Sequence, residues 1–143
     1  MEIKMLSARD LSMFSDLLEV LAEAFGGPFG GSTGSAALLG KPHFLAVVAL
    51  DGLRVVGGLT SYMLESYTSS RPLLYVYDLA VASAYRRQGI GTGLIRFITA
   101  YGRENGFEEI FVQAHRADSY ALDFYRRAGA TSEEDVVQFS FSL

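Results

Sequence analysis

Cysteine is absent from this 143-residue sequence, histidine occurs only twice, and no apolar run approaches the roughly 20 residues that span a bilayer. Without cysteine there is no disulfide, no thiolate nucleophile and no cysteine-ligated zinc, so any thiol chemistry must come from a cofactor. His43 and His115 are isolated and lack the spacing of metal ligands, so we expect no metal. Residues 1–4 lack the pattern of a secretory leader, so we expect a cytoplasmic location.

Basic residues are also in short supply. The sequence has 12 Lys and Arg against 16 Asp and Glu, a formal net charge of −4. Nucleic-acid binding needs a basic face, so we expect neither a nucleic-acid nor a membrane partner. The charge suits a cationic small molecule but is ordinary for a soluble protein. Hydrophobic residues make up 50% and aromatics 13%, which is enough for one core, and we expect a single domain over residues 1–143.

The spacing of apolar residues predicts a mixed α and β chain. An Asp-Gly pair at 51–52 between two apolar runs favours a hairpin, and Ser7 with Asp10 resembles a capping box before the first helix. Asp118 and Ser119 are alternative caps for the last helix. Strands are expected at 3–6, 44–50, 55–64, 73–81, 110–114 and 136–141. Helices are expected between the Ser7 cap and Gly26, at 35–39, around 94–105 and around 119–128. The predicted class is α+β with a mixed sheet.

A glycine-rich loop is expected at residues 26–35, which contain five glycines, one proline and three Ser or Thr. Such a loop between ordered elements is often functional, although a plain linker has the same composition.

The segment Arg86-Arg87-Gln88-Gly89-Ile90-Gly91-Thr92-Gly93 joins a strong strand to a strong helix. Glycines let the backbone approach an anion, and the N–H groups at a helix start favour negative charge. Two arginines add donors suited to phosphate, so the segment predicts a diphosphate site. It lacks the Gly-Lys-Ser/Thr of a P-loop, and Leu94 stands where a dinucleotide fingerprint needs its third glycine.

Two segments resemble the GNAT superfamily of N-acetyltransferases. Arg86-x-x-Gly89-x-Gly91 is similar to its acetyl-CoA signature, and Asp118-x-x-Ala121-x-x-Phe124-Tyr125-x-x-x-Gly129 is similar to its second motif, with Asp118 in place of Asn. Residues 75–81, 86–90 and 112–114 resemble the aminoglycoside 3-N-acetyltransferase branch, except that His115-Arg116 replace acidic residues. The resemblance implies a GNAT fold: a mostly antiparallel sheet with a splayed central strand and flanking helices.

The resemblance also implies acetyl-CoA as co-substrate. Backbone groups of Leu79 and Val81 would bind the pantetheine arm, and one N–H there would stabilise the oxyanion. The implied cofactor-binding residues are Leu79, Ala80, Val81, Arg86, Arg87, Gln88, Gly89, Ile90, Gly91, Thr92, Gly93, Asp118, Ala121 and Tyr125.

Two catalytic residues are expected. Tyr125 matches the position of the family's general acid, which protonates the departing thiolate, although helical spacing alone also fits a core aromatic. Asp78 is a lone carboxylate within an apolar strand, where aspartate is disfavoured, and it is expected to bind and help deprotonate the amine. Tyr77 would point to the opposite face unless the strand is bulged there.

The expected substrate site comprises Tyr77, Asp78 and the acidic cluster Glu133, Glu134 and Asp135, for which a solvated face is the alternative. The leading hypothesis is acetyl transfer to the 3-amino group of an aminoglycoside. Acetylation of a polyamine or protein amine, and a non-catalytic acetyl-CoA-binding module, are the alternatives. A homodimer is possible through the apolar edge at residues 136–141.

Overall fold

The computed structural model describes the backbone of residues 1–27 and 32–143 and the side chains of residues 1–27 and 35–143. The chain separates into two compact units, Met1–Gln113 and Ala114–Leu143. Residues 28–31 of the glycine-rich loop lie outside the described residues, so the functional role expected of that loop stays a prediction. The single domain expected over residues 1–143 likewise stays a prediction.

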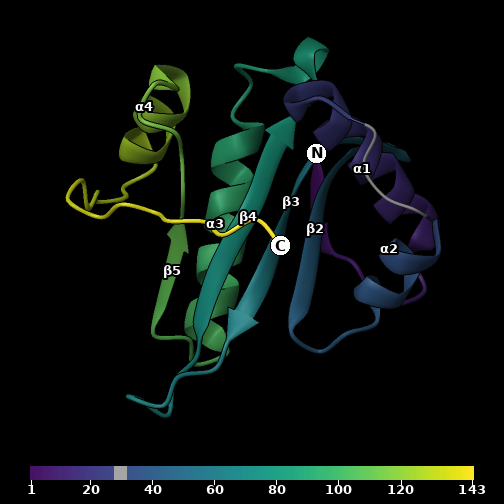
Figure 1. The fold of residues 1–143 in the computed structure, drawn as a ribbon. Helices are drawn as coiled ribbons and strands as arrows, with labels where there is room; N and C mark the ends of the chain where they lie inside the picture. The colour runs from purple at the N-terminus through teal and green to yellow at the C-terminus, as the bar shows by residue number, and fades with distance from the viewer. Residues whose placement is uncertain (28–31) are drawn as a thin grey trace. The chain divides into compact units, whose positions relative to one another are not determined.

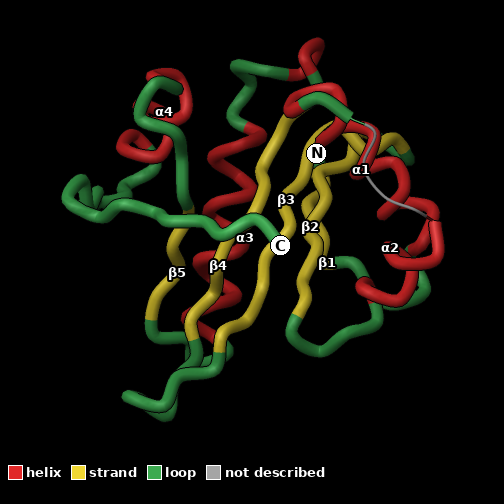
Figure 2. Tube along the Cα trace, viewed as in Figure 1, coloured by secondary structure: helices red, strands yellow, loops and turns green. Residues whose placement is uncertain are grey.

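The first unit is built on a five-stranded sheet whose strands follow one another in chain order (Figures 1 and 2). All neighbouring strands are antiparallel except the last pair, which is parallel. Gly52 has a φ of 61° at the turn of the expected hairpin, where a side chain would be strained. The strands are β1 (Glu2–Met5), β2 (Phe44–Asp51), β3 (Arg54–Leu64), β4 (Leu73–Val81) and β5 (Glu109–Val112).

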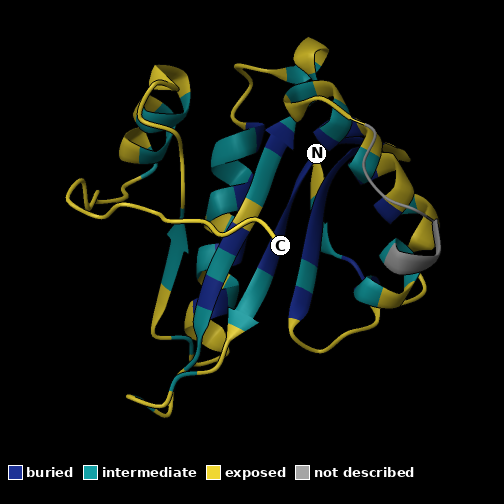
Figure 3. Ribbon diagram, viewed as in Figure 1, coloured by how far each residue is buried: buried dark blue, intermediate teal, exposed yellow. Residues whose placement is uncertain are grey.

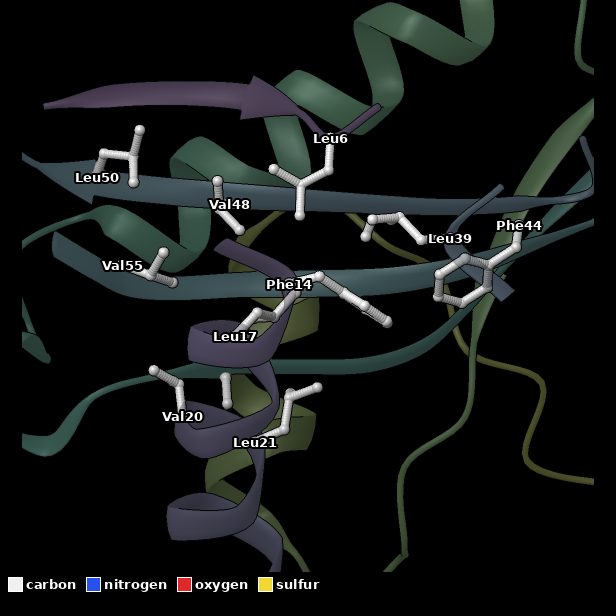
Figure 4. Packing of buried hydrophobic residues seen from close by; sticks show 12 residues of the cluster. Leu6, Phe14, Leu17, Val20, Leu21, Leu39, Phe44, Val48, Leu50 and Val55 are labelled. Carbon is white, nitrogen blue, oxygen red and sulfur yellow. The ribbon is translucent and has the colours of Figure 1, made fainter. Parts of the chain in front are cut away.

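Helices cover both faces of this sheet (Figure 1). One face packs against α1 (Leu11–Phe25) and α2 (Ser32–Leu39), and the other packs against α3 (Ile90–Glu104). The middle strands are consequently buried on both sides, as the dark ribbons of Figure 3 show. Figure 4 shows the core beneath α1, where Phe14, Leu17 and Leu21 meet residues of β2 and β3. No helix among the described residues is both long and apolar enough to cross a membrane.

Helix α1 begins at Leu11, so Ser7 is not its cap. Instead, residues 7–10 form a turn in which the Asp10 carboxylate accepts from the Ser7 N–H over 2.7 Å and from the Ser7 hydroxyl over 3.0 Å. Both side chains of the expected capping box are thus used, but by a turn that precedes the helix. The Ser7 and Lys4 contacts hold the pKa of Asp10 below its ordinary value, with the Ser7 backbone bond the largest cause.

The second unit contains one helix, α4 (Ser119–Arg127), and an extended C-terminal segment. The strand expected at residues 136–141 is wrong: the segment has no regular structure (Figure 2), and the Phe139 and Phe141 side chains are 83% and 89% exposed. A run of apolar residues forms a strand only where a neighbouring strand pairs with its backbone N–H and C=O groups. No described strand pairs with this segment.

Candidate active site

A β-bulge in the middle of β4 changes which way its side chains point. The pairing with β3 skips Tyr77, because Thr60 faces Asp78 while the next residue, Ser61, faces Val76. In a regular strand, adjacent side chains point to opposite faces, and one extra residue cancels that alternation. Tyr77 and Asp78 are therefore expected on the same face of the sheet.

That shared face is the one covered by α1 and α2. Asp78 lies two residues before Ala80, which is buried in the core cluster beneath α1. The ring of Tyr77 lies 5.8 Å from the ring of Tyr62, which packs against the same cluster. The condition set by the sequence, a bulge at this point, is met, and the two side chains are neighbours.

Aromatic rings form a continuous row on this face. Successive ring centroids lie between 4.7 and 5.8 Å apart, mostly edge to face. One end is fixed by the Tyr75 hydroxyl, which donates to Gln113 Oε1 over 2.7 Å. Ring faces attract cations and pack against sugar-like or apolar rings. This aromatic row comprises Phe14, Phe44, Tyr62, Tyr77, Tyr75 and Phe111.

Asp78 places one carboxyl group beside the aromatic row. Burial raises its pKa above the ordinary value, because a low-dielectric surrounding disfavours the charged form. Its charge in turn helps to raise the pKa values of Tyr62 and Tyr75, after the larger effects of burial and of Tyr77. Among residues 1–27 and 32–143, no group forms a hydrogen bond or ion pair with this carboxylate. A carboxylate in this state is a good proton acceptor and a good partner for a cation.

Beyond the bulge, β4 pairs with β3 and with no other described strand. β5 pairs with β4 as far as Val76 and then ends. On the other side, the Ala82 N–H donates to the Val56 carbonyl over 2.8 Å. Hydrogen-bonding direction alternates along an antiparallel pair, so Leu79 and Val81 direct their N–H and C=O groups away from β3. The central strand is therefore splayed from its neighbour, and backbone groups of both residues face the open side.

The turn after β4 is shaped by two residues in the left-handed region. Arg87 has a φ of 64° and Gly89 a φ of 82°. Gly89 precedes the first residue of α3, and its carbonyl accepts the first helical bond from Gly93 over 2.9 Å. A Cβ atom at Gly89 would have no heavy atom within 4 Å, so the space beside it is open. Successive N–H groups in such a turn form a concave anion site.

The residues between Gly89 and Gly93 divide into backbone and side-chain roles. The N–H groups of Ile90, Gly91 and Thr92 come before the first helical bond, so they have no acceptor within the helix. The Ile90 side chain is buried in the core beneath α3, which leaves only its backbone for a ligand. The turn therefore has the open, donor-rich geometry that a diphosphate requires.

The two arginines of the turn differ. Arg86 donates from Nε to the Val81 carbonyl over 2.9 Å, so its guanidinium is fixed at the end of β4. Arg87 and Gln88 are exposed, and Gln88 Nε2 approaches the Ala84 carbonyl at 3.4 Å.

The second unit holds the remaining expected site residues. Asp118 is the cap of α4: its Oδ1 accepts from the Ala121 N–H over 3.0 Å, which settles the choice between Asp118 and Ser119. The ring of Tyr125 contacts the ring of Phe124 at 5.1 Å. Because Asp118 is engaged in capping, its side chain already has a structural task.

The acidic cluster at 133–135 is exposed. Glu134 forms an ion pair with Arg126 at 3.0 Å, and its carbonyl accepts from Arg116 over 2.9 Å. One of the two residues that depart from the resembling branch, Arg116, is thus tied to this segment. The expected role of Glu133, Glu134 and Asp135 toward a substrate stays a prediction.

Sequence reasoning did not identify Tyr62 and Tyr75 as site residues. Their Cα atoms are directly paired across β3 and β4. The spacing of Tyr75 and Tyr77 on one strand was a signal, but the partner on β3 follows only from the strand register. Within the described parts of the chain, no three His, Asp or Glu side chains are grouped to hold a metal ion.

The chain matches the model of the acetyltransferase (GNAT) family over residues 14–130. It therefore belongs to the GNAT acetyltransferase family, whose members use acetyl-CoA as co-substrate. The five-stranded mixed sheet with its flanking helices confirms the expected fold class.

Solved structures give the strongest similarity. An aminoglycoside acetyltransferase from an uncultured soil metagenomic sample, solved in complex with sisomicin, is 43% identical, with a TM-score of 0.94, over 99% of this chain and 95% of that one. A second aminoglycoside acetyltransferase from soil is 34% identical, with a TM-score of 0.89, over 99% of this chain and 97% of that one. These similarities confirm the expected position near the aminoglycoside acetyltransferase branch.

Curated relatives match over shorter stretches. The chloroplastic GCN5-related N-acetyltransferase 6 of Arabidopsis thaliana is 36% identical over 38% of this chain and 19% of its own length. Streptothricin acetyltransferase of Streptomyces lavendulae is 30% identical over 51% of this chain and 39% of its own length. The matches thus span well under half of either relative.

Proposed function

We propose that this protein transfers the acetyl group of acetyl-CoA to a primary amine of a cationic small molecule. The proposed acceptor is the 3-amino group of an aminoglycoside. The observation that carries the proposal is the bulge of β4. It places the Asp78 carboxyl beside the aromatic row, one residue before the splayed part of the strand. An amine held by Asp78 would lie next to the edge where the family binds its thioester.

The reaction requires a neutral amine, and Asp78 supplies the means. A protonated amine binds the carboxylate as a cation, and a raised carboxyl pKa makes it easier for Asp78 to take the proton. The amine nitrogen then forms a bond to the acetyl carbon, and the carbon–sulfur bond breaks. The second amine proton passes to water as the amide forms. Tyr125 gives a proton to the departing thiolate and regains one from water. The products are the N-acetyl compound and CoA.

Binding of the donor is assigned to backbone and arginine groups. Leu79 directs its N–H and C=O groups to the open side of β4, and Val81 directs its N–H there, where they suit an amide-bearing pantetheine arm. The Val81 carbonyl instead accepts from Arg86. The N–H groups of residues 90–92 and the arginines of the turn suit the diphosphate. Both groups of contacts rely on the backbone, which explains how glycines and a strand end form a nucleotide site.

Specificity for a cationic, ring-containing acceptor is assigned to the carboxylate and to the rings of the aromatic row that are not buried, with Tyr77 the most exposed; Phe14 and Phe44 belong to the core. Sugar rings stack on aromatic faces, and several ammonium groups favour an acidic protein. The similarity to two aminoglycoside acetyltransferases, one of them solved with sisomicin, supports this substrate class.

The test is release of free CoA from acetyl-CoA in the presence of a panel of aminoglycosides, beginning with sisomicin. NMR of the product would identify the acetylated nitrogen. Turnover that depends on acceptor and gives a 3-N-acetyl product is the expected result. CoA binding without turnover on any aminoglycoside would overturn the substrate, and polyamines and N-terminal peptides in the same panel would then identify another acceptor.

A further inference from the structure

The segment between β4 and the phosphate-binding turn is held by side chains from distant parts of the sheet unit. Residues 83–85 form a short 3-10 turn, and Arg86 follows directly. The turn itself carries backbone bonds from Tyr85 to Ala82 and from Arg86 to Ser83, at 2.8 and 3.4 Å. Bonds this local fix the shape of the turn but not its direction relative to the sheet.

Tyr85 provides one anchor. Its hydroxyl donates to Asp51 Oδ2 over 3.1 Å, at the hairpin between β2 and β3. The Arg54 guanidinium lies 5.9 Å above the same ring, and the ring packs against the core beneath α3. The Tyr85 side chain is therefore held by apolar packing, by the Arg54 guanidinium above its ring and by the hydrogen bond of its hydroxyl.

Glu23, near the end of α1, provides a second anchor. Its carboxylate accepts from the Ser83 N–H over 3.3 Å. Ser83 holds the pKa of Glu23 below the ordinary value, first through its side chain and then through its backbone, with smaller contributions from Arg86 and Arg54. Glu23 and Arg54 also line a surface hollow together with Ala82 at the start of the segment.

These two carboxylates lie near a turn that is built for anions. A carboxylate repels a diphosphate, so neither Asp51 nor Glu23 serves the donor by direct contact. Instead, both carboxylates accept hydrogen bonds from groups of the segment 83–85, on its side toward α1 and the β2–β3 hairpin. By accepting these bonds, the two carboxylates orient the face of residues 86–91 that carries the free N–H groups.

We infer that Tyr85, together with Asp51 and Glu23, positions the turn 86–91 for the diphosphate of the donor. The inference rests on the proposed use of acetyl-CoA. The three residues act through the backbone of the turn, so they affect the nucleotide end of the donor and leave the acetyl-transfer end unchanged. The kinetics with an acetyl donor that lacks a diphosphate should therefore not depend on these three residues.

The experiment compares acetyl-CoA with S-acetylpantetheine, which carries the thioester but no diphosphate, in wild type and Tyr85→Phe. This substitution removes the bond to Asp51 and keeps the ring. We expect KM for acetyl-CoA and the calorimetric Kd of CoA to rise about three- to tenfold, the effect of one hydrogen bond. The value of kcat/KM for S-acetylpantetheine should stay unchanged, and Tm should fall by at most about 5 °C.

Controls separate positioning from folding. Tyr101→Phe removes a hydroxyl near the end of α3 and should change the kinetics with neither donor. Glu23→Gln keeps an acceptor for Ser83 and should stay close to wild type, whereas Glu23→Ala should show the same donor-selective loss as Tyr85→Phe.

Equal losses with both donors, or an unchanged Kd for CoA in Tyr85→Phe and Glu23→Ala, would overturn the inference. The Kd comparison needs no acceptor. Normal CoA binding in wild type with no acetyl transfer would therefore count against the proposed function, while the variants would still decide the role of the turn.

Discussion

Asn in place of Asp78 should make the protein more stable and far less active. In the folded protein, burial raises the pKa of this carboxyl above the ordinary 3.8. The folded state then binds the proton more tightly than the unfolded chain, so stability falls as pH rises from 3.8 through the folded-state pKa. Above that pKa the full cost of the buried charge is present, and Asp78→Asn removes it.

The size of the stability gain is limited by water. One pKa unit corresponds to about 1.36 kcal/mol, and Asp78 is only partly buried, so solvent screening reduces the effect. We therefore expect Asp78→Asn to raise the free energy of unfolding at about pH 7 by at most about 1 kcal/mol. The difference should shrink as the pH falls through the folded-state pKa and vanish well below 3.8, where the wild-type carboxyl is protonated in both states.

Activity should change in the opposite sense. Loss of a general base lowers rates by about 10²- to 10⁴-fold, so kcat/KM for the aminoglycoside should fall by that factor. In wild type, the acid limb of the pH profile of kcat/KM should lie above the ordinary carboxyl range, because the folded-state pKa is raised.

The assays are urea unfolding and initial-rate kinetics from about pH 4 to about pH 8. Glu104→Gln, an exposed carboxyl at the end of α3, is the matched control and should change neither quantity. A variant less stable than wild type at about pH 7, with a loss that shrinks as the pH falls, would refute the reasoning. It would mean that the carboxylate accepts structural hydrogen bonds.

Three further substitutions, one of them with a matched control, test the local geometry. Gly58→Ala should lower the free energy of unfolding, measured in urea, by about 3 kcal/mol, because the new Cβ would overlap the backbone oxygen of Val47. The control Gly40→Ala, whose Cβ would have no contact under 3.8 Å, should leave it unchanged. Ser61→Ala should leave stability unchanged or raise it by up to about 1 kcal/mol, because the buried hydroxyl has no partner among the described residues; a loss would contradict this. Gly89→Ala should lower stability by about 1 kcal/mol and weaken CoA binding in calorimetry, because its φ is 82°, and unchanged binding would count against the anion site.

Local sequence signals predicted most of the elements. Helix α1 follows from apolar residues at spacings of three and four, and the β2–β3 hairpin follows from two apolar runs around Asp51-Gly52. The strand predicted at 73–81 has the bounds of β4. These features depend on interactions within a few residues, so the sequence carries them directly. The strand predicted at 136–141 failed because a strand depends on a partner that its own residues do not specify.

The candidate site divides in the same way. By itself, the sequence determined the glycine-rich turn and the lone Asp78 within an apolar strand, and it predicted the class of ligand that each suits. Tertiary structure decided that a bulge at Tyr77 brings two adjacent side chains to one face, and that Tyr62 of β3 completes the aromatic row. It also decided that Asp51 and Glu23 support the turn. Strand register and long-range hydrogen bonds join residues far apart in the chain, and their energies depend on the packed fold, so no local pattern encodes them.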